Sequence, residues 1–256
     1  MTDRSLRSTF DLAVEQYRRS RPEPPPELIQ AMLDGGLRPG DRVLEVGCGT
    51  GQATAALAAH GLSITALELG PAMAQAARDH LARWSNVTVV TGAFEEFTAS
   101  EPFAAVISVQ ALHWVEPAIA LTKAASLLRG GGSLLLAWHH MPLPDDAFTR
   151  ASGPIYQRYE EPLQLQRPTP SSGVNDYRAA LQAVADFVGP DEFRFAWQHR
   201  YRAADYLDLL QTFSNVQAMS ETNRTRFLVE IGALVQEHGG TVVRDYESVL
   251  LSAHRS

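Results

Sequence analysis

Short apolar runs alternate with amphipathic stretches along the first half of the chain. The runs lie at 43–46, 62–69, 86–91, 103–109 and 133–138, and apolar residues with helical spacing follow the first, second and fourth of them. Nearly continuous apolar runs are typical of parallel strands that are buried on both faces, and their alternation with helices predicts βαβ units. The pattern therefore predicts an α/β fold built on a parallel sheet.

The pattern changes after residue 144. Helical spacing over 147–161 is followed by a Pro-, Gln- and Ser-rich loop over 162–173 and a second helix over 176–188. Apolar residues then alternate with polar ones over 193–201, which predicts a half-buried strand. Helices over 203–212 and 220–238 and a last strand over 241–251 complete the chain. We expect 144–190 to be a helical cap inserted after the fifth strand.

One stretch carries the strongest chemical signal. Glu45 lies near the end of the first apolar run, and Gly47, Gly49 and Gly51 follow at alternate positions before an Ala-rich helix over 52–59. Glycine allows positive φ and lets a ligand approach the main chain closely, and the free N–H groups of the following helix can face a polar or anionic group. The arrangement predicts a strand, a tight turn and a helix that together bind a ligand.

Two common nucleotide motifs match this turn poorly. The dinucleotide fingerprint Gly-x-Gly-x-x-Gly needs a third glycine where this chain has Gln52. A phosphate-binding P-loop needs Gly-Lys-Ser/Thr, and Lys123 is the only lysine of the chain. The Glu-x-Gly-x-Gly-x-Gly spacing instead resembles motif I of the class I S-adenosylmethionine (SAM) methyltransferases, and Gln110-Ala-x-His113-Trp114 resembles motif IV of their small-molecule group, which includes the trans-aconitate methyltransferases.

This resemblance implies a fold and an activity. The fold is a three-layer Rossmann-like α/β sandwich with a seven-stranded sheet in the order 3-2-1-4-5-7-6, in which strand 7 is antiparallel, and a small helical cap. The whole chain, 1–256, is expected to be one domain, with 1–35 as an N-terminal helical lid. The activity is transfer of the SAM methyl group to a nucleophilic O, N or C of a small organic molecule, with S-adenosylhomocysteine as the product.

The resemblance also implies the site residues. Glu68, at the end of the second strand, is expected to accept hydrogen bonds from both ribose hydroxyls, and Glu45 to position the methionine amino group. Tyr17 and Arg21 match a Tyr-x3-Arg-Pro lid element, in which Arg21 pairs with the methionine carboxylate. The full set of expected cofactor contacts is Tyr17, Arg21, Glu45, Gly47, Cys48, Gly49, Gly51, Glu68, Leu69, Met73, Gly92, Ala93, Phe94 and Gln110.

The acceptor is expected beyond the fourth strand. His113, with an unperturbed pKa of about 6.5, is the candidate catalytic base for a hydroxyl acceptor, and the expected substrate contacts are Trp114, His139, Tyr156 and Tyr159. His139 and His140 are adjacent, and neighbouring side chains rarely converge on one ion, so no metal is expected.

Composition restricts the partners. The net charge of −7 disfavours nucleic acid, since its binders usually have a basic surface. Cys48 is alone, no secretory signal is apparent, and no apolar run approaches the ~20 residues of a membrane span. We expect a cytoplasmic monomer or homodimer that contacts no membrane.

Three alternatives to methyl transfer stay open at this point. The first is an NAD-dependent oxidoreductase, which Gln52 disfavours. The second is a SAM-fold protein with cyclase-like chemistry, and the third is a catalytically silent SAM-binding subunit.

Overall fold

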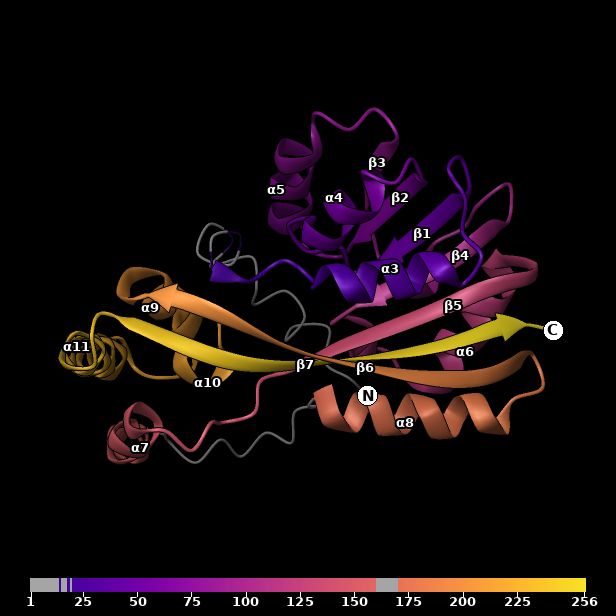
Figure 1. Ribbon diagram of the computed structural model, residues 1–256. Helices are drawn as coiled ribbons and strands as arrows, with labels where there is room; N and C mark the ends of the chain where they lie inside the picture. The colour runs from indigo at the N-terminus through magenta and orange to yellow at the C-terminus, as the bar shows by residue number, and fades with distance from the viewer. Residues whose placement is uncertain (1–13, 15–17, 19, 160–169) are drawn as a thin grey trace.

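Seven strands form one sheet in the computed structural model, which describes residues 14, 18, 20–159 and 170–256. The order is β3-β2-β1-β4-β5-β7-β6, as the sequence predicts (Figure 1). The strands are β1 (Arg42–Val46), β2 (Ser63–Glu68), β3 (Val87–Thr91), β4 (Phe103–Val109), β5 (Leu128–His140), β6 (Phe187–Arg202) and β7 (Thr241–Arg255). The described helices are α3 (Pro26–Asp34), α4 (Gln52–Ala58), α5 (Pro71–Leu81), α6 (Pro117–Leu127), α7 (Ala147–Tyr159), α8 (Pro170–Ala183), α9 (Ala203–Gln211), α10 (Ser214–Gln217) and α11 (Glu221–Glu237), with 3-10 turns η2 (Phe94–Glu96) and η3 (Leu112–Trp114).

The parallel part of the sheet consists of β1 to β5. β1 lies between β2 and β4, with Val43 opposite both Ile64 and Ala105. The carboxyl ends of β1 and β4 therefore lie side by side, where the strand order reverses and where open α/β sheets bind their ligands. The glycine turn follows one of these two ends and the Gln110–Trp114 segment follows the other.

β7 is antiparallel to both of its neighbours. Its residue Ser248 lies opposite His139 of β5 on one side and Phe195 of β6 on the other. β6 and β7 are much longer than β1 to β4, and they extend past the end of the parallel strands (Figure 1). This extension supplies a wall beyond the carboxyl ends of β1 and β4.

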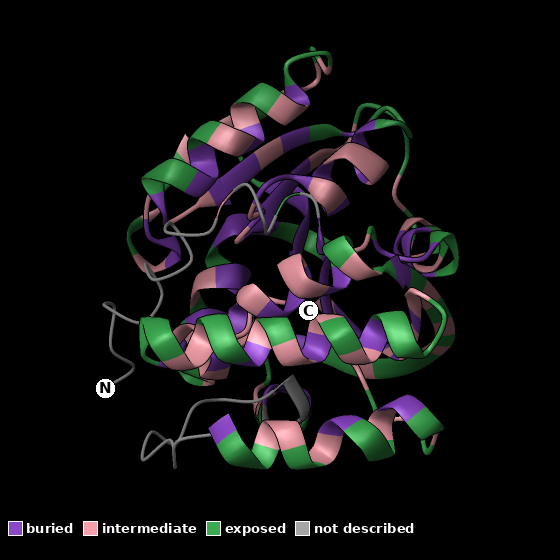
Figure 2. Cartoon of the chain, turned by 90° about the vertical axis from the view of Figure 1, so that its left-hand side faces the viewer, coloured by how far each residue is buried: buried purple, intermediate pink, exposed green. Residues whose placement is uncertain are grey.

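Alternate residues of the central strands build two cores, one on each face of the sheet. On β5, Leu135 and Ala137 pack in the core formed with α3, α4 and α5, whereas Leu134 and Leu136 pack in the core formed with α6 and α8. Strands buried on both faces read as continuous apolar runs, which explains the pattern in the sequence. Figure 2 shows strands that are mostly buried and outer helices whose buried and exposed residues alternate.

The cap predicted over 144–190 has its two helices in different places. α8 lies along the sheet and contributes Val174, Tyr177 and Leu181 to the same core as α6. α7 packs instead with α9, α10 and α11 against the extension of β6 and β7, in a third core centred on Phe227, Ile231 and Leu210. The helices beyond the carboxyl ends of the sheet are therefore α7 and α9–α11 (Figure 1).

Two further boundaries correct the sequence prediction. Residues 170–173 were predicted as loop but begin α8, because proline is well tolerated in the first turn of a helix. Gly173 is required there by close packing, since a Cβ at this position would lie 2.8 Å from the His113 Cβ. The three glycines at 130–132 follow the helical spacing over 117–128, which predicts that they end that helix, but they lie within β5, where its register against β4 shifts.

Among the described residues, no helix is long and apolar enough to cross a bilayer.

Candidate active site

The glycine turn after β1 is shaped by backbone geometry. Gly47, Gly49 and Gly51 all have positive φ, at 72°, 58° and 90°, a region in which only glycine is unstrained. A Cβ on Gly47 would lie 2.2 Å from the Ala111 Cβ, so the turn and the segment after β4 approach each other closely. Gly51 precedes α4 and packs against Leu81, and it lines neither of the cavities described below.

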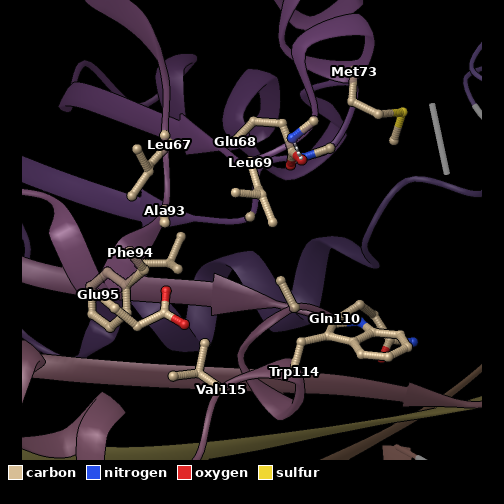
Figure 3. Close-up of a pocket in the computed structure, with 16 residues that line it drawn as sticks. Leu67, Glu68, Leu69, Met73, Ala93, Phe94, Glu95, Gln110, Trp114 and Val115 are labelled. Carbon is tan, nitrogen blue, oxygen red and sulfur yellow. Dashed lines mark hydrogen bonds between the residues drawn. The ribbon is translucent and has the colours of Figure 1, made fainter. Parts of the chain in front are cut away.

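Glu68 holds this turn from the end of β2. Its two carboxylate oxygens accept hydrogen bonds from the backbone N–H groups of Gly49 and Gly70, each at 2.9 Å (Figure 3). A carboxylate offers about four acceptor sites, so these two donors do not saturate it. The Glu68 carboxylate therefore ties the glycine turn to the start of α5.

A first cavity lies beside Glu68, at the carboxyl ends of β2 and β3. Leu69, Met73, Gly92, Ala93 and Phe94 line it, as the sequence predicts for the adenosine end of the cofactor (Figure 3). Its other lining residues are Val46, Gly47, Gly49, Leu67, Glu68, Gly70, Glu95, Gln110, Ala111, Trp114 and Val115. Most of these side chains are apolar, and the glutamates lie at its edges, a composition suited to a flat base attached to a polar sugar.

Glu95 is a lining residue that the sequence analysis missed. It belongs to the 3-10 turn η2, which directly follows Ala93, and its side chain enters the cavity from the side opposite Glu68 (Figure 3). The signal for it was the pair of acids at 95 and 96, of which only Glu95 lines the cavity.

A second cavity lies on the other side of the glycine turn. From the sheet and the turn it is lined by Glu45, Gly47, Cys48, Gly49, Gln52, Ala53, Val109, Gln110, His113, Trp114, His139, Met141 and Tyr246, from the N-terminal segment by Arg21, Pro22 and Pro24, and from the segment after α9 by Phe213. Arg21 is held there by a hydrogen bond from its Nε to the Thr212 hydroxyl, at 3.1 Å, and by the ring of Phe213.

The two cavities meet at four shared residues, Gly47, Gly49, Gln110 and Trp114. Gln110 has a φ of 61°, the only positive value outside glycine among the described residues, and its amide Nε2 donates to the carbonyl of His139 at 2.8 Å. Strain of this kind occurs at functional sites when the surrounding structure enforces it. The junction is thus a rigid position that is open to both cavities.

Three buried polar atoms at the second cavity have no hydrogen-bond partner among the described residues. They are Gln52 Nε2, Gln110 Oε1 and His113 Nδ1. Buried polar groups are almost always satisfied, so this cluster is suited to a ligand that carries both donors and acceptors. The joined cavities, the glycine turn and the carboxylates fit SAM, whose adenosine would lie in the first cavity and whose amino-acid tail would lie in the second.

Comparison with known proteins agrees with this geometry. A family model described as a methyltransferase domain matches residues 43–132. An uncharacterized methyltransferase of Mycobacterium tuberculosis is 37% identical over 231 residues, which are 86% of this chain and 91% of the relative. The chain belongs to the class I SAM-dependent methyltransferases. It transfers the SAM methyl group and releases S-adenosylhomocysteine, and this activity replaces the three alternatives considered above.

Solved structures share the fold of this methyltransferase. A putative type II methyltransferase from Anaeromyxobacter dehalogenans aligns with a TM-score of 0.63 at 21% identity, over 91% of this chain and 97% of the other. A SAM-dependent methyltransferase from Thiobacillus denitrificans, solved with S-adenosylhomocysteine, aligns with a TM-score of 0.56 at 16% identity, over 95% of this chain and 97% of the other. At these identities the likeness concerns the fold alone.

Glu45 of the methyltransferase is almost fully buried beneath the glycine turn. The Thr54 hydroxyl donates to its Oε2 at 2.6 Å. Burial raises the pKa of Glu45 from 4.5 to about 7, against the lowering effect of this hydrogen bond, with a small further rise from Glu68. The buried carboxylate lacks a cationic partner among the described residues that would restore an ordinary pKa.

His113 lies where the sequence placed it, but with a different proton affinity. Burial lowers its pKa from 6.5 to about 4, so the expectation of an unperturbed value was wrong. The imidazole is neutral throughout the physiological range and stands beside Trp114, with ring centroids 5.3 Å apart. It can accept a proton, although as a weaker base than a surface histidine.

The two tyrosines expected at the acceptor site line neither cavity. Tyr156 and Tyr159 of α7 pack edge-on against Phe227 of α11, and the Tyr159 hydroxyl donates to Glu230. Tyr246 and Phe213, which the sequence analysis did not select, line the second cavity instead. Tyr17 lies outside the described residues, and no group of three or more metal-ligating side chains occurs within them.

Proposed function

We propose that this methyltransferase methylates a small organic molecule bound in the part of the second cavity formed by His113, Trp114, His139, Met141, Phe213 and Tyr246. The observation that carries the proposal is the junction, where Gly47, Gly49, Gln110 and Trp114 line both cavities at the carboxyl ends of β1 and β4. A methyl group held at this junction would face the acceptor side directly. The enclosing aromatic and aliphatic side chains suit a small molecule better than a polymer.

The cofactor roles form part of the proposal. Glu68 would accept hydrogen bonds from the ribose hydroxyls, Ala93, Phe94 and Met73 would contact the adenine, and the glycine turn would hold the amino-acid tail. Glu45 would take the tail's ammonium, and Arg21, across the same cavity, would pair with its carboxylate. The two charged ends of the tail then meet the two charged side chains of the second cavity.

The bound sulfonium supplies an activated methyl group for in-line displacement. The protein's contribution is then mainly to hold the nucleophile in line at near-attack distance. A base is required only when the acceptor arrives protonated. His113, which lines the second cavity, would accept the proton from an O–H or N–H acceptor.

Two named relatives support a small-molecule acceptor. A ubiquinone biosynthesis O-methyltransferase of Xanthomonas campestris is 39% identical over 103 residues, which are 39% of this chain and 43% of the relative. A demethylmenaquinone methyltransferase of Tropheryma whipplei is 29% identical over 161 residues, which are 62% of this chain and 65% of the relative. We further propose a cytoplasmic monomer or homodimer that binds no nucleic acid, in keeping with the net charge of −7.

A screen of phenols, small acids and amines for S-adenosylhomocysteine release tests the proposal. We expect release with members of at least one class and none without an acceptor. If the purified protein binds SAM but methylates only nucleic acid or protein, the small-molecule assignment is wrong.

Glu45 should make SAM affinity depend on pH. Its pKa of about 7 in the free protein lies above the ordinary 4.5, so acid converts it to the neutral form, which cannot pair with the ammonium. Pairing lowers this pKa in the complex, and affinity must therefore fall as the pH drops. From pH 7 to pH 5.5 the loss should be about tenfold for one linked proton. The α-amino group, with a pKa of about 8, stays protonated over this window.

Calorimetric titration with SAM over this pH range measures the effect. Glu45→Gln is the matched control, because it keeps the shape of the side chain but cannot ionise. Its affinity for SAM should be lower than that of the wild type and should not change with pH. A wild-type affinity that does not change between pH 7 and pH 5.5 would contradict the role of Glu45.

A further inference from the structure

Three neighbouring strands each contribute one polar side chain to a line at the wall of the second cavity. His139 of β5, Ser248 of β7 and Trp197 of β6 are joined through the Ser248 hydroxyl, with His139 Nδ1 at 2.8 Å and Trp197 Nε1 at 2.8 Å. His139 and Ser248 lie directly opposite each other on β5 and β7. The His139 ring also packs edge-on against the Trp197 ring, at 5.8 Å between centroids.

The donors and acceptors of this line determine where its protons lie. The indole Nε1 can only donate, so Ser248 Oγ must accept from Trp197. Ser248 is fully buried, and among the described residues its hydroxyl has one other partner, His139 Nδ1. A buried hydroxyl that donates to nothing is strongly disfavoured. The Ser248 proton therefore points at Nδ1, and the neutral imidazole must carry its own proton on Nε2.

The Nε2 atom is available to a ligand. It has no hydrogen-bond partner among the described residues, yet it is not one of the fully buried polar atoms that lack a partner. It is therefore accessible on the side where His139 lines the second cavity. Burial, with smaller contributions from Arg21 and His140, lowers the pKa of His139 to about 4. The ring therefore stays neutral and keeps its single proton under ordinary conditions.

We propose that His139 is a substrate-binding residue that presents a fixed Nε2–H donor to an oxygen atom of the methyl acceptor, and that Ser248 and Trp197 are positioning residues that set its tautomer. This rests on the proposed function and narrows its substrate class to acceptors that carry a carbonyl, hydroxyl or carboxylate oxygen. The two histidines of the cavity then have opposite roles. His113, whose nitrogens have no partner among the described residues, can accept a proton, whereas His139 accepts at Nδ1 from Ser248 and presents only a donor to the cavity.

The tautomer can be tested without knowing the acceptor. Long-range ¹H–¹⁵N NMR spectra of the protein loaded with S-adenosylhomocysteine distinguish the two neutral tautomers of each histidine, and His139→Gln identifies the His139 signals. In the wild type we expect the population of the Nε2–H tautomer to exceed that of the Nδ1–H tautomer by roughly 5- to 150-fold. In Ser248→Ala we expect a mixture. A wild-type His139 that carries its proton on Nδ1 overturns the proposal.

The contact with oxygen is tested with phenol and aniline, two probes of the same shape. Titration of phenol into the loaded protein should shift the His139 Nε2 signal, and aniline should shift it much less. Equal shifts, or none with phenol, contradict the proposal. The tautomer result does not depend on the acceptor, so a failed screen for small-molecule acceptors would be distinguished from a failure of the His139 assignment.

Kinetics with any phenol or acid that the screen identifies complete the test. His139→Leu should lower kcat/KM by about 5- to 100-fold, His139→Gln by less because its amide N–H₂ can replace Nε2–H, and Ser248→Ala by an intermediate factor. His140→Leu is the matched control, since the neighbouring histidine points to the opposite face of β5 and lines neither cavity. Wild-type kinetics in His139→Leu, or equal losses in His140→Leu, would show that the contact is absent.

Discussion

His113→Ala should lower kcat for a hydroxyl acceptor by about 10² to 10⁴, the usual cost of losing a general base, while SAM affinity stays within a few-fold. The loss should lie toward the smaller end of this range, because burial lowers the pKa of His113 to about 4 and so weakens the base. Steady-state kinetics at saturating SAM measure kcat, and calorimetry measures the affinity. If the acceptor is already a carboxylate, no proton has to be removed, and the change should appear mainly in KM.

The pH profile separates this base from an ordinary histidine. A base with a pKa of about 4 is unprotonated above pH 5, so kcat of the wild type should stay level from pH 5 to pH 8 at saturating SAM. A base with an unperturbed pKa would instead give a fall below about pH 6.5.

His113→Gln is the matched variant for the catalytic role. It keeps a polar side chain of similar size but removes the basic nitrogen. Catalysis that survives in His113→Gln but not in His113→Ala would indicate positioning. If both variants keep the wild-type kcat and KM, His113 has a packing role against α8 and Trp114.

Glu68→Ala should weaken SAM binding by about 10²- to 10⁴-fold. Two hydrogen bonds from a diol to a carboxylate are each worth roughly 1.5–3 kcal/mol. The structure adds a second source of loss, because the same carboxylate holds the N–H groups of Gly49 and Gly70. Calorimetric titration with S-adenosylhomocysteine measures the sum of both effects.

An analogue without the ribose hydroxyls separates the two sources. If Glu68 binds the diol, the 2′,3′-dideoxy form of S-adenosylhomocysteine should bind the wild type weakly and should lose little more affinity in Glu68→Ala. Equal losses for both ligands would assign the effect to the loop alone. Unchanged affinity for S-adenosylhomocysteine in the variant would remove Glu68 from the cofactor site altogether.

The cofactor side of the site could be predicted because its residues follow strand ends in a fixed order. Gly47 comes directly after β1, Glu68 ends β2, and Ala93 follows β3. The order of the parallel strands therefore brings these three residues together. The signal is local, because the motif spacing alone selects residues that line the first cavity together. Gly51 was the exception, because its packing against Leu81 depends on the angle of α5.

The acceptor side could not be predicted in the same way. Ser248 meets His139 across 109 residues of sequence, and only the pairing of β7 with β5 brings them together. Aromatic residues in an insertion often contact substrates, which favours Tyr156 and Tyr159, but the face of α7 that carries them packs on Phe227. The start of α8 was missed because a Pro-Ser-Ser-Gly sequence is locally typical of a loop.

The position of β7 between β5 and β6 has a consequence for the order of folding. Residues 42–127 can form the first four strands and their helices from nearby partners, whereas β7 must close loops of about a hundred residues to reach β5, and such distant pairings form slowly. The glycine turn, Glu68 and His113 therefore belong to the early-forming part, and the wall of His139, Ser248 and Trp197 is completed only when β7 docks. A partly folded chain would then form the proposed cofactor side of the site before the proposed acceptor side.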